Sequence, residues 1–447
     1  MASISRALQR IKQELGNLIP AEAVERTCRE LNYTYRKRKL DPLTTIQLFV
    51  QQVLNYNTAL THLPRLSGLE FDPSAYCDAR KRLPLTLIGR LVRTVAHTLR
   101  DELNTRGLWM GHRTWLVDGS ACSMPDTPEL QHEFGQPGAQ KPGCGFPVAH
   151  LLAMFDVYSG MLLEVLAFPH RTHDMSKVWA LHPLLQAGDV VVGDRGFCSY
   201  AHVAALQMRG IHAVKRIHQR IIVRFRDKRQ RRRKLKGATG EPRSRLIRKL
   251  GKHDQLVEWD KPPKKPQYMT QGQYDQLPES IVVRELRYRI QDRGCRTHEI
   301  TLATTLLNAG RYTKRKLARL FKARWQVELD LRNLKITLNM DVLKCKSPQG
   351  VRKELAIYAL VYNLVCLVRE KAARRQRVKP CRISFVDVLR WLQCAEPGAD
   401  LPRFVVNRLR PGRHEPRVVK RRPKNYPRMT RPRAEYKKCL YSHRKES

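Results

Sequence analysis

The segment DVVVGDRGF, residues 189–197, is a short run of valines that ends in a carboxylate, Asp194. A continuous apolar run of this length, bounded by glycine and charged residues, is typical of a buried strand. An earlier segment, TWLVDG at residues 114–119, has the same pattern and reaches its carboxylate at Asp118. The two patterns therefore predict two buried strands, each ending in an acidic side chain.

The segments around these strands complete an α/β pattern. Residues 147–168 (PVAHLLAMFDVYSGMLLEVLAF) predict two long strands joined by a turn at YSG. Residues 172–186 predict a helix with Thr172 or Asp174 near its N-cap. A further helix is predicted at 200–210 and a strand at 211–217. The order of strand, hairpin, helix, strand, helix and strand predicts an α/β sheet covered by helices.

The flanking segments differ from this core in composition and in the spacing of their apolar residues. Apolar residues before residue 108 recur at helical spacing, and two basic clusters, YRKRK at 35–39 and DARKRLP at 78–84, lie among them. This part is interpreted as a DNA-recognition domain, with a solvated scaffold as the alternative. The predicted domains are a helical N-terminal domain at 1–108, an α/β core at 109–217 and 296–375, a β-rich basic insertion at 218–295 with a mobile loop, and a basic, partly disordered C-terminal region at 376–447.

The charge balance points to a polyanionic partner. Lysine and arginine total 85 against 40 acidic residues, which gives a formal net charge of +45. Nucleic acid is the expected partner, because phosphate neutralisation releases counterions in proportion to the number of cationic contacts. A ribosomal or chromatin-type protein is the alternative, and an anionic membrane surface is a more distant one.

Cysteine usage and hydropathy suggest a cytoplasmic protein near the genome. The 11 cysteines form no C-x-x-C pair, which argues against a zinc ribbon and a disulfide framework. The most apolar run, LAIYALVYNLVCLV at 355–368, is too short to span a bilayer and predicts a buried helix.

The segment FKARWQVELDLRNLK, residues 321–335, places an acid inside a cationic helix. At about 100° per residue, Phe321, Arg324, Glu328 and Lys335 share one narrow stripe at the edge of an apolar face. A glutamate and an arginine at this spacing often form only a surface pair. Together with the two strand-end aspartates, however, Glu328 could hold two hard divalent cations for phosphoryl transfer.

These motifs resemble the bacterial DDE transposases of the insertion-sequence-four family, whose catalytic core is RNase H-like. The family signature Tyr-x2-Arg-x3-Glu-x6-Lys is matched by Phe321, Arg324, Glu328 and Lys335, with phenylalanine in place of tyrosine. The segments LVDGSACSMPDTPE (116–129) and VVGDRGFCSY (191–200) resemble the two aspartate segments of the family. The resemblance extends over roughly residues 25–370.

The resemblance implies an RNase H-like mixed sheet flanked by helices and a cut-and-paste DNA transposase. It assigns catalysis and the binding of two Mg²⁺ ions, with Mn²⁺ as a possible substitute, to Asp118, Asp194 and Glu328. It assigns DNA contacts to Phe321, Arg324, Lys335, Arg195 and Lys322. The implied partners are double-stranded DNA of the transposon ends and of the target, and a second copy of the chain in a synaptic complex, with no membrane.

Other interpretations stay open at this stage. A catalytically inactive, transposase-derived DNA-binding protein is the main alternative, and a structure-selective nuclease on the same core is another. Trp259 and Trp325 are candidates to hold a flipped base, although packing is the simpler role for each. His170, His173 and Asp174 are interpreted as the start of a helix rather than as metal ligands.

Overall fold

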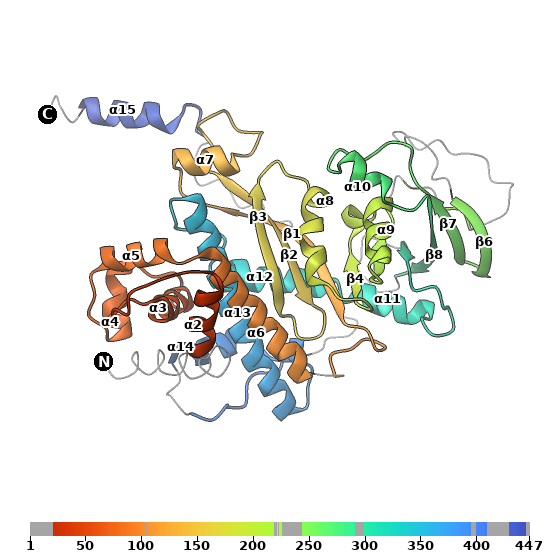
Figure 1. Ribbon diagram of the computed structural model, residues 1–447, viewed down its shortest axis with the longest axis horizontal. Coiled ribbons are helices and arrows are strands. Elements are labelled where there is room, and N and C mark those ends of the chain that lie inside the picture. The colour runs from red at the N-terminus through yellow and green to blue at the C-terminus, as the bar shows by residue number, and fades with distance from the viewer. Residues whose placement is uncertain are drawn as a thin grey trace.

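Nine strands form one mixed sheet in the order β3-β2-β1-β4-β5-β9-β8-β7-β6 (Figure 1). The computed structural model describes residues 21–103, 106–218, 221, 223–225, 244–290, 299–394, 399–408 and 429–443. The strands are β1 (Thr114–Ser123), β2 (Val148–Asp156), β3 (Leu162–Pro169), β4 (Val190–Gly193), β5 (His212–Arg216), β6 (Ser244–Gly251), β7 (Asp254–Asp260), β8 (Ser280–Arg289) and β9 (Glu299–Thr304). Strand β4 runs parallel to β1 and β5, and the other neighbours are antiparallel. The predicted RNase H-like mixed sheet flanked by helices is confirmed.

Helices cover both faces of this sheet (Figure 1). The α-helices of the described residues are α2 (Ala21–Glu30), α3 (Pro42–Leu54), α4 (Leu63–Ser67), α5 (Pro73–Arg82), α6 (Leu85–Leu103), α7 (Pro128–Phe134), α8 (Asp174–Lys177), α9 (Tyr200–Met208), α10 (Gln271–Asp275), α11 (Lys314–Lys322), α12 (Trp325–Arg332), α13 (Pro348–Gln376), α14 (Phe385–Cys394) and α15 (Arg433–His443), of which α2–α5 and α15 lie away from the sheet (Figure 1). One apolar cluster joins Leu116 and Val192 to α6, α12 and α13. A second joins Trp115 and Val117 to α8 and α9 on the opposite face. Alternate residues of β1 therefore point into different layers.

The hairpin between β2 and β3 forms as predicted, and its turn is built from polar contacts. The carboxylate of Asp156 accepts hydrogen bonds from the amides of Tyr158 (3.1 Å) and Ser159 (2.7 Å). Gly160 follows with a φ of +73°, a conformation that side chains rarely adopt. These contacts satisfy the turn and fix the register of both strands.

The long helix α13 runs through the core. Its residues 357–368 are all buried, as predicted for the apolar run. Among the described residues, no helix combines the length and the hydropathy that crossing a membrane requires.

A buried acid of α13 connects the N-terminal helices to the core. Glu354 accepts hydrogen bonds from the backbone amides of Lys344 (3.0 Å) and Cys345 (2.9 Å) and from the side chain of Asn57 (2.5 Å). The loop held in this way returns to β1, where the amide of Ser123 donates to the carbonyl of Asp341 at 3.1 Å. The N-terminal helices and the end of β1 thus share one hydrogen-bonded network.

The structure corrects several local predictions. Strand β1 does not end at Asp118 but continues to Ser123 as an antiparallel partner of β2. The helix predicted at 172–186 is a four-residue α-helix, Asp174–Lys177, followed by a 3-10 helix at Val178–Leu184. His173, rather than Thr172 or Asp174, is the N-cap, because its Nδ1 accepts from the Met175 amide. The helical role preferred over a metal site for this segment fits that geometry.

The predicted insertion and C-terminal region are only partly described. Strands β6, β7 and β8 lie in the segment assigned to the insertion, and they extend the central sheet through the pairing of β8 with β9. The segment 226–243, which carries most of the predicted mobile loop, lies outside the described residues. Of the C-terminal region at 376–447, predicted to be partly disordered, residues 395–398, 409–428 and 444–447 also lie outside them, and the described part contains α14 and α15.

Candidate active site

The parallel pairing of β1 with β4 places the two aspartates side by side. The last parallel pair is Val117 with Gly193, and Asp118 and Asp194 are the next residue of each segment. Their side chains alternate with Val117 and Gly193, so both point to the face covered by α12 and α13. The sequence predicted two acids at strand ends, and the register shows that they meet at one edge of a ladder.

The segment that carries Glu328 is not the single α-helix that the sequence predicted. Helix α11 ends at Lys322, helix α12 begins at Trp325, and a π-helical turn occupies residues 333–337. At the junction the amide of Val327 bonds to the carbonyl of Arg324, three residues back, at 3.1 Å. The stripe calculated at about 100° per residue is therefore wrong in detail, because the turn and the π-helix change the angles between the signature residues.

Arg324 lies between two of the three acids. Its guanidinium nitrogens lie 4.0 Å from Oδ2 of Asp118 and 3.5 Å from Oε1 of Glu328. The guanidinium is mostly buried and lies near the rings of Phe321 and Trp325, at 5.9 and 5.4 Å. It thus partly balances two carboxylates on the same face of the sheet.

The electrostatic environment of Asp118 reflects this crowding. Burial raises the pKa of the Asp118 carboxyl above its ordinary value, although the Gly119 amide and Arg324 lower it. The carboxylates of Asp194 and Glu328 raise this pKa further. The three acids therefore lie within electrostatic range of one another, and additional positive charge would stabilise them.

Asp194 has its own cationic neighbour, which the sequence did not single out. A guanidinium nitrogen of Arg216 lies 3.9 Å from Oδ1 of Asp194, and that oxygen is buried without a hydrogen-bond partner. Arg216 follows Lys215, which pairs with Gly193 in the β4–β5 ladder, so it stands beside Asp194 by register. Only the strand register identifies Arg216, because arginine is common throughout this chain.

The remaining predicted DNA contacts separate into surface and core residues. Arg195 and Lys322 are exposed, and Lys335 forms an ion pair with Asp341 at 3.1 Å. Phe321, by contrast, is only 2% exposed and packs in the core, so its ring is not accessible to DNA. The apolar face predicted for this segment is buried as expected: Leu320, Val327, Leu331, Leu334 and Leu338.

The two candidate tryptophans have different environments. Trp259 is buried, and its indole donates to Glu285 at 2.9 Å, which is a packing role. Trp325 is 52% exposed on the helix that carries Glu328. Of the two, only Trp325 presents a ring that a base could reach.

The acids suit a hard divalent cation, although they are not gathered at metal-binding distance. Within the described ranges, no three histidine, cysteine or acidic side chains stand close enough to form a metal site. The buried oxygen of Asp194, which lacks a hydrogen-bond partner, and the raised pKa of Asp118 are both features that a cation would relieve. Glu328 is half exposed, so its carboxylate can rotate away from Arg324 toward such an ion. Carboxylate oxygens are the ligands that Mg²⁺ prefers.

A second acid of α12, Asp330, is predicted to make stability depend on pH. It is buried at 1% exposure, and burial raises the pKa of its carboxyl to about 6, above the ordinary value of 3.8. The folded state therefore binds this proton more tightly than the unfolded state, so its contribution to stability is lost as the pH rises from about 4 through about 6. In the wild-type protein this loss should lower the unfolding free energy by about 1.4 kcal/mol between about pH 5 and pH 7.5. We expect the Asp330→Asn protein to lack this part of the pH dependence.

Urea unfolding of both proteins at the two pH values measures this effect. The matched control is Asp78→Asn, which alters an exposed carboxylate paired with Lys81. An Asp330→Asn protein with the same pH dependence as wild type would show that Asp330 is ionised at no cost in the folded state.

A mixed RNase H-like sheet that carries two aspartates and a helical glutamate on one face defines a DDE-type polynucleotide-processing protein. Residues 109–364 match the family model described as "Transposase DDE domain", and the chain belongs to this family. The predicted membership of the insertion-sequence-four group is confirmed by relatives in Escherichia coli (strain K12).

Two of these relatives define the extent of the similarity. The transposase InsG for insertion sequence element IS4 is 27% identical over 443 residues, which cover 92% of this chain and 93% of that protein. The putative transposase InsZ is 25% identical over 187 residues, which cover 40% of this chain and 61% of that protein. A solved piggyBac transposase synaptic complex with hairpin DNA aligns over 87% of this chain and 80% of its own, at 11% identity and a TM-score of 0.40.

Proposed function

We propose that this chain is the active transposase of an insertion sequence. It binds the terminal inverted repeats, cuts the DNA at their boundaries and joins the freed ends to target DNA in the bacterial nucleoid. The observation that carries this proposal is the placement of Asp118 and Asp194 directly after the last parallel pair of β1 and β4, with Glu328 linked to Asp118 through Arg324.

Asp118, Asp194 and Glu328 would hold two Mg²⁺ ions, with Mn²⁺ as a possible substitute. When bound, two such ions stabilise the attacking and the leaving oxygen of a phosphodiester displacement. The acids themselves supply the negative ligand set, and a bound cation would relieve their mutual repulsion. The chain needs no serine or tyrosine nucleophile for this chemistry.

The cations around the acids would orient the DNA backbone. Arg324 and Arg216 are each within 4.0 Å of a site carboxylate, so they lie where a scissile phosphate would approach. Lys335 lies near the far end of β1, where it pairs with Asp341, and would bind a phosphate at some distance from the acids. Exposed Arg195 and Lys322 would bind phosphates farther along the strand.

A non-enzymatic DNA-binding role is the second candidate. The presence of all three acids on one face favours the enzyme, because a binding protein gains nothing from carboxylates that repel phosphate. Two copies of the chain are proposed to pair two transposon ends in a synaptic complex.

The test is cleavage of the element's own terminal repeat by the purified full chain. We expect cuts at the repeat boundary with Mg²⁺ and none with a chelator, and no boundary cuts in DNA whose repeat has been scrambled. Tight binding of the repeat without any cleavage in Mg²⁺ or Mn²⁺ would favour the DNA-binding role.

A further inference from the structure

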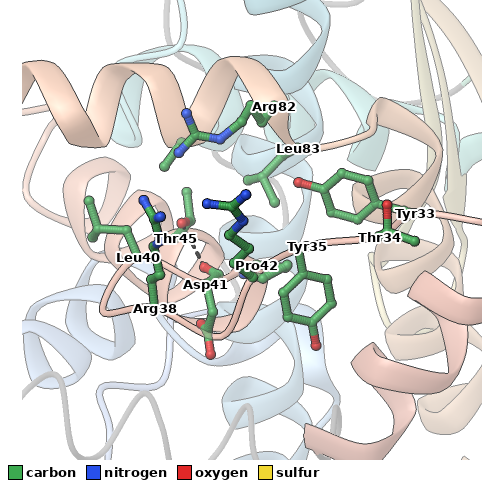
Figure 2. A pocket seen from close by; sticks show the side chains of 12 residues that line it. Tyr33, Thr34, Tyr35, Arg38, Leu40, Asp41, Pro42, Thr45, Arg82 and Leu83 are labelled. Carbon is green, nitrogen blue, oxygen red and sulfur yellow. Dashed lines mark hydrogen bonds between the residues drawn. The ribbon is translucent and has the colours of Figure 1, made fainter.

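The two basic clusters noted in the sequence converge on one pocket of the N-terminal helices. The pocket has a volume of about 640 Å³ and is lined by the segment 33–42, the first turn of α3 and the end of α5. Figure 2 shows Arg38, Arg82 and Tyr33 around the same space. The clusters at 35–39 and 78–84 are separated by 38 residues of sequence, so only the fold brings them together. This part of the chain contributes none of the three acids.

Positive charge in this pocket exceeds the negative charge of its acids. Arg36, Arg38 and Arg82 are exposed, and no carboxylate of the described residues lies at ion-pair distance from any of them. The one acid in the lining, Asp41, is engaged as the N-cap of α3, where it accepts from the Thr44 amide at 2.7 Å. Three guanidinium groups thus face solvent around one concave surface, an arrangement that favours binding of a phosphate.

One side of the pocket is aromatic. The rings of Tyr33 and Tyr35 lie 6.0 Å apart with an interplanar angle of 29°, and both side chains are half-buried. Arg82 lies close enough to lower the pKa of the Tyr33 hydroxyl, although burial raises it more. A planar ring beside guanidinium groups offers a nucleotide two surfaces: the ring can contact its sugar or base, and the guanidinium groups can bind its phosphate.

We propose that this pocket binds one nucleotide of a DNA strand, with its phosphate held by Arg36, Arg38 and Arg82 and its sugar or base against Tyr35. The proposal rests on the proposed function, and it adds a DNA contact separate from the acidic site. A pocket of about 640 Å³ holds a ligand of nucleotide size but not the cross-section of a duplex. The nucleotide can come from the backbone of duplex DNA or from an unpaired strand, and the experiment distinguishes these sources.

The experiment measures binding of fluorescein-labelled DNA to the full chain in a chelator, where no cleavage occurs. The probes are a duplex of the terminal repeat and one of its strands, each titrated over a range of salt concentrations. We expect the double variant Arg38→Ala/Arg82→Ala to bind DNA about 10- to 100-fold more weakly than wild type. The slope of log affinity against log salt concentration should also become shallower by about two, one for each phosphate contact removed. The matched control is Arg65→Ala, an exposed arginine on the neighbouring helix α4.

Tyr35→Ala identifies the source of the nucleotide. A loss of about 5- to 100-fold for the single strand alone indicates an unpaired base stacked on the ring. Loss of duplex binding in the arginine variant, with Tyr35→Ala unchanged, indicates a duplex backbone phosphate instead and overturns the Tyr35 contact.

The outcomes separate this proposal from the proposed function. If wild type binds both probes and the double arginine variant matches it in affinity and salt slope, the pocket proposal is overturned while the transposase proposal stands. The pocket proposal is also overturned if Arg65→Ala loses as much binding as the double variant. If wild type binds neither probe, the proposed function itself fails.

Discussion

Replacing Asp194 by asparagine is expected to abolish DNA cleavage and leave the protein folded and able to bind DNA. The buried oxygen of Asp194, which lacks a hydrogen-bond partner, would become a neutral amide group, which is a poor ligand for a hard cation. Asp118→Asn and Glu328→Gln should have the same effect, because each removes one carboxylate from the same face. We expect each variant to lose at least about 10³-fold in the cleavage rate, which is the scale found when a group that stabilises the transition state is removed.

Stability and binding distinguish this loss from simple misfolding. Burial and two neighbouring carboxylates raise the pKa of Asp118, so its ionised form is destabilised in the folded protein. The Asp118→Asn protein should therefore be at least as stable as wild type near neutral pH. In a chelator it should also bind DNA at least as tightly, because one charge that repels phosphate is gone.

Single-turnover cleavage, thermal unfolding and DNA binding in a chelator together test this prediction. The control is Glu279→Gln, which neutralises a carboxylate whose side chain is 89% exposed. Cleavage at the wild-type rate by any of the three variants would remove that residue from the proposed metal site. A large fall in stability together with lost cleavage would assign the residue a structural role.

Much of the core was predictable because short-range patterns control it. The valine run before Asp194 and the two apolar strands flanking the YSG turn at 148–169 give strong local signals, and buried parallel strands bring their carboxyl ends together. The exact neighbours were not predictable, because they depend on strand register. The position of Arg216 beside Asp194 follows from the pairing of Gly193 with Lys215, which no local pattern reveals.

The signature segment shows the limit of helical periodicity. A regular period correctly assigned its apolar residues to the core, but it could not detect the turn at residues 323–324 or the π-helix after Arg332. Tertiary contacts decide such breaks, and they override weak propensity differences between neighbouring residues. Phe321 was consequently placed at a ligand-binding edge by the sequence and in the core by the structure.

The largest fall in stability is expected when Asp254 in strand β7 is replaced by alanine. Arg284 on the neighbouring strand β8 is 1% exposed, and it donates to both carboxylate oxygens of Asp254, at 2.8 and 2.6 Å. It also donates to the carbonyl of Tyr312 at 2.6 Å, just before helix α11. This ion pair therefore joins the strands of the predicted insertion to the segment that leads to Glu328.

Asp254→Ala should destabilise this region by about 3–5 kcal/mol, because it leaves a buried guanidinium without its counter-ion. Backbone amides of β7 and β8 should then exchange with solvent about 10²- to 10³-fold faster, which hydrogen exchange measures directly. The matched control is Glu258→Ala on the same strand, which removes the ion pair with exposed Arg245 and a hydrogen bond from the Ser280 hydroxyl and should cost about 1–2 kcal/mol.

A second variant separates the buried charge from the loss of contacts. Asp254→Leu combined with Arg284→Met replaces both charges by apolar groups, and such replacements of buried pairs are often neutral. We therefore expect the double variant to recover most of the protection that Asp254→Ala loses. If the double variant instead exchanges as fast as Asp254→Ala, the packing and the Tyr312 contact stabilise this junction, and the ion pair adds little to them.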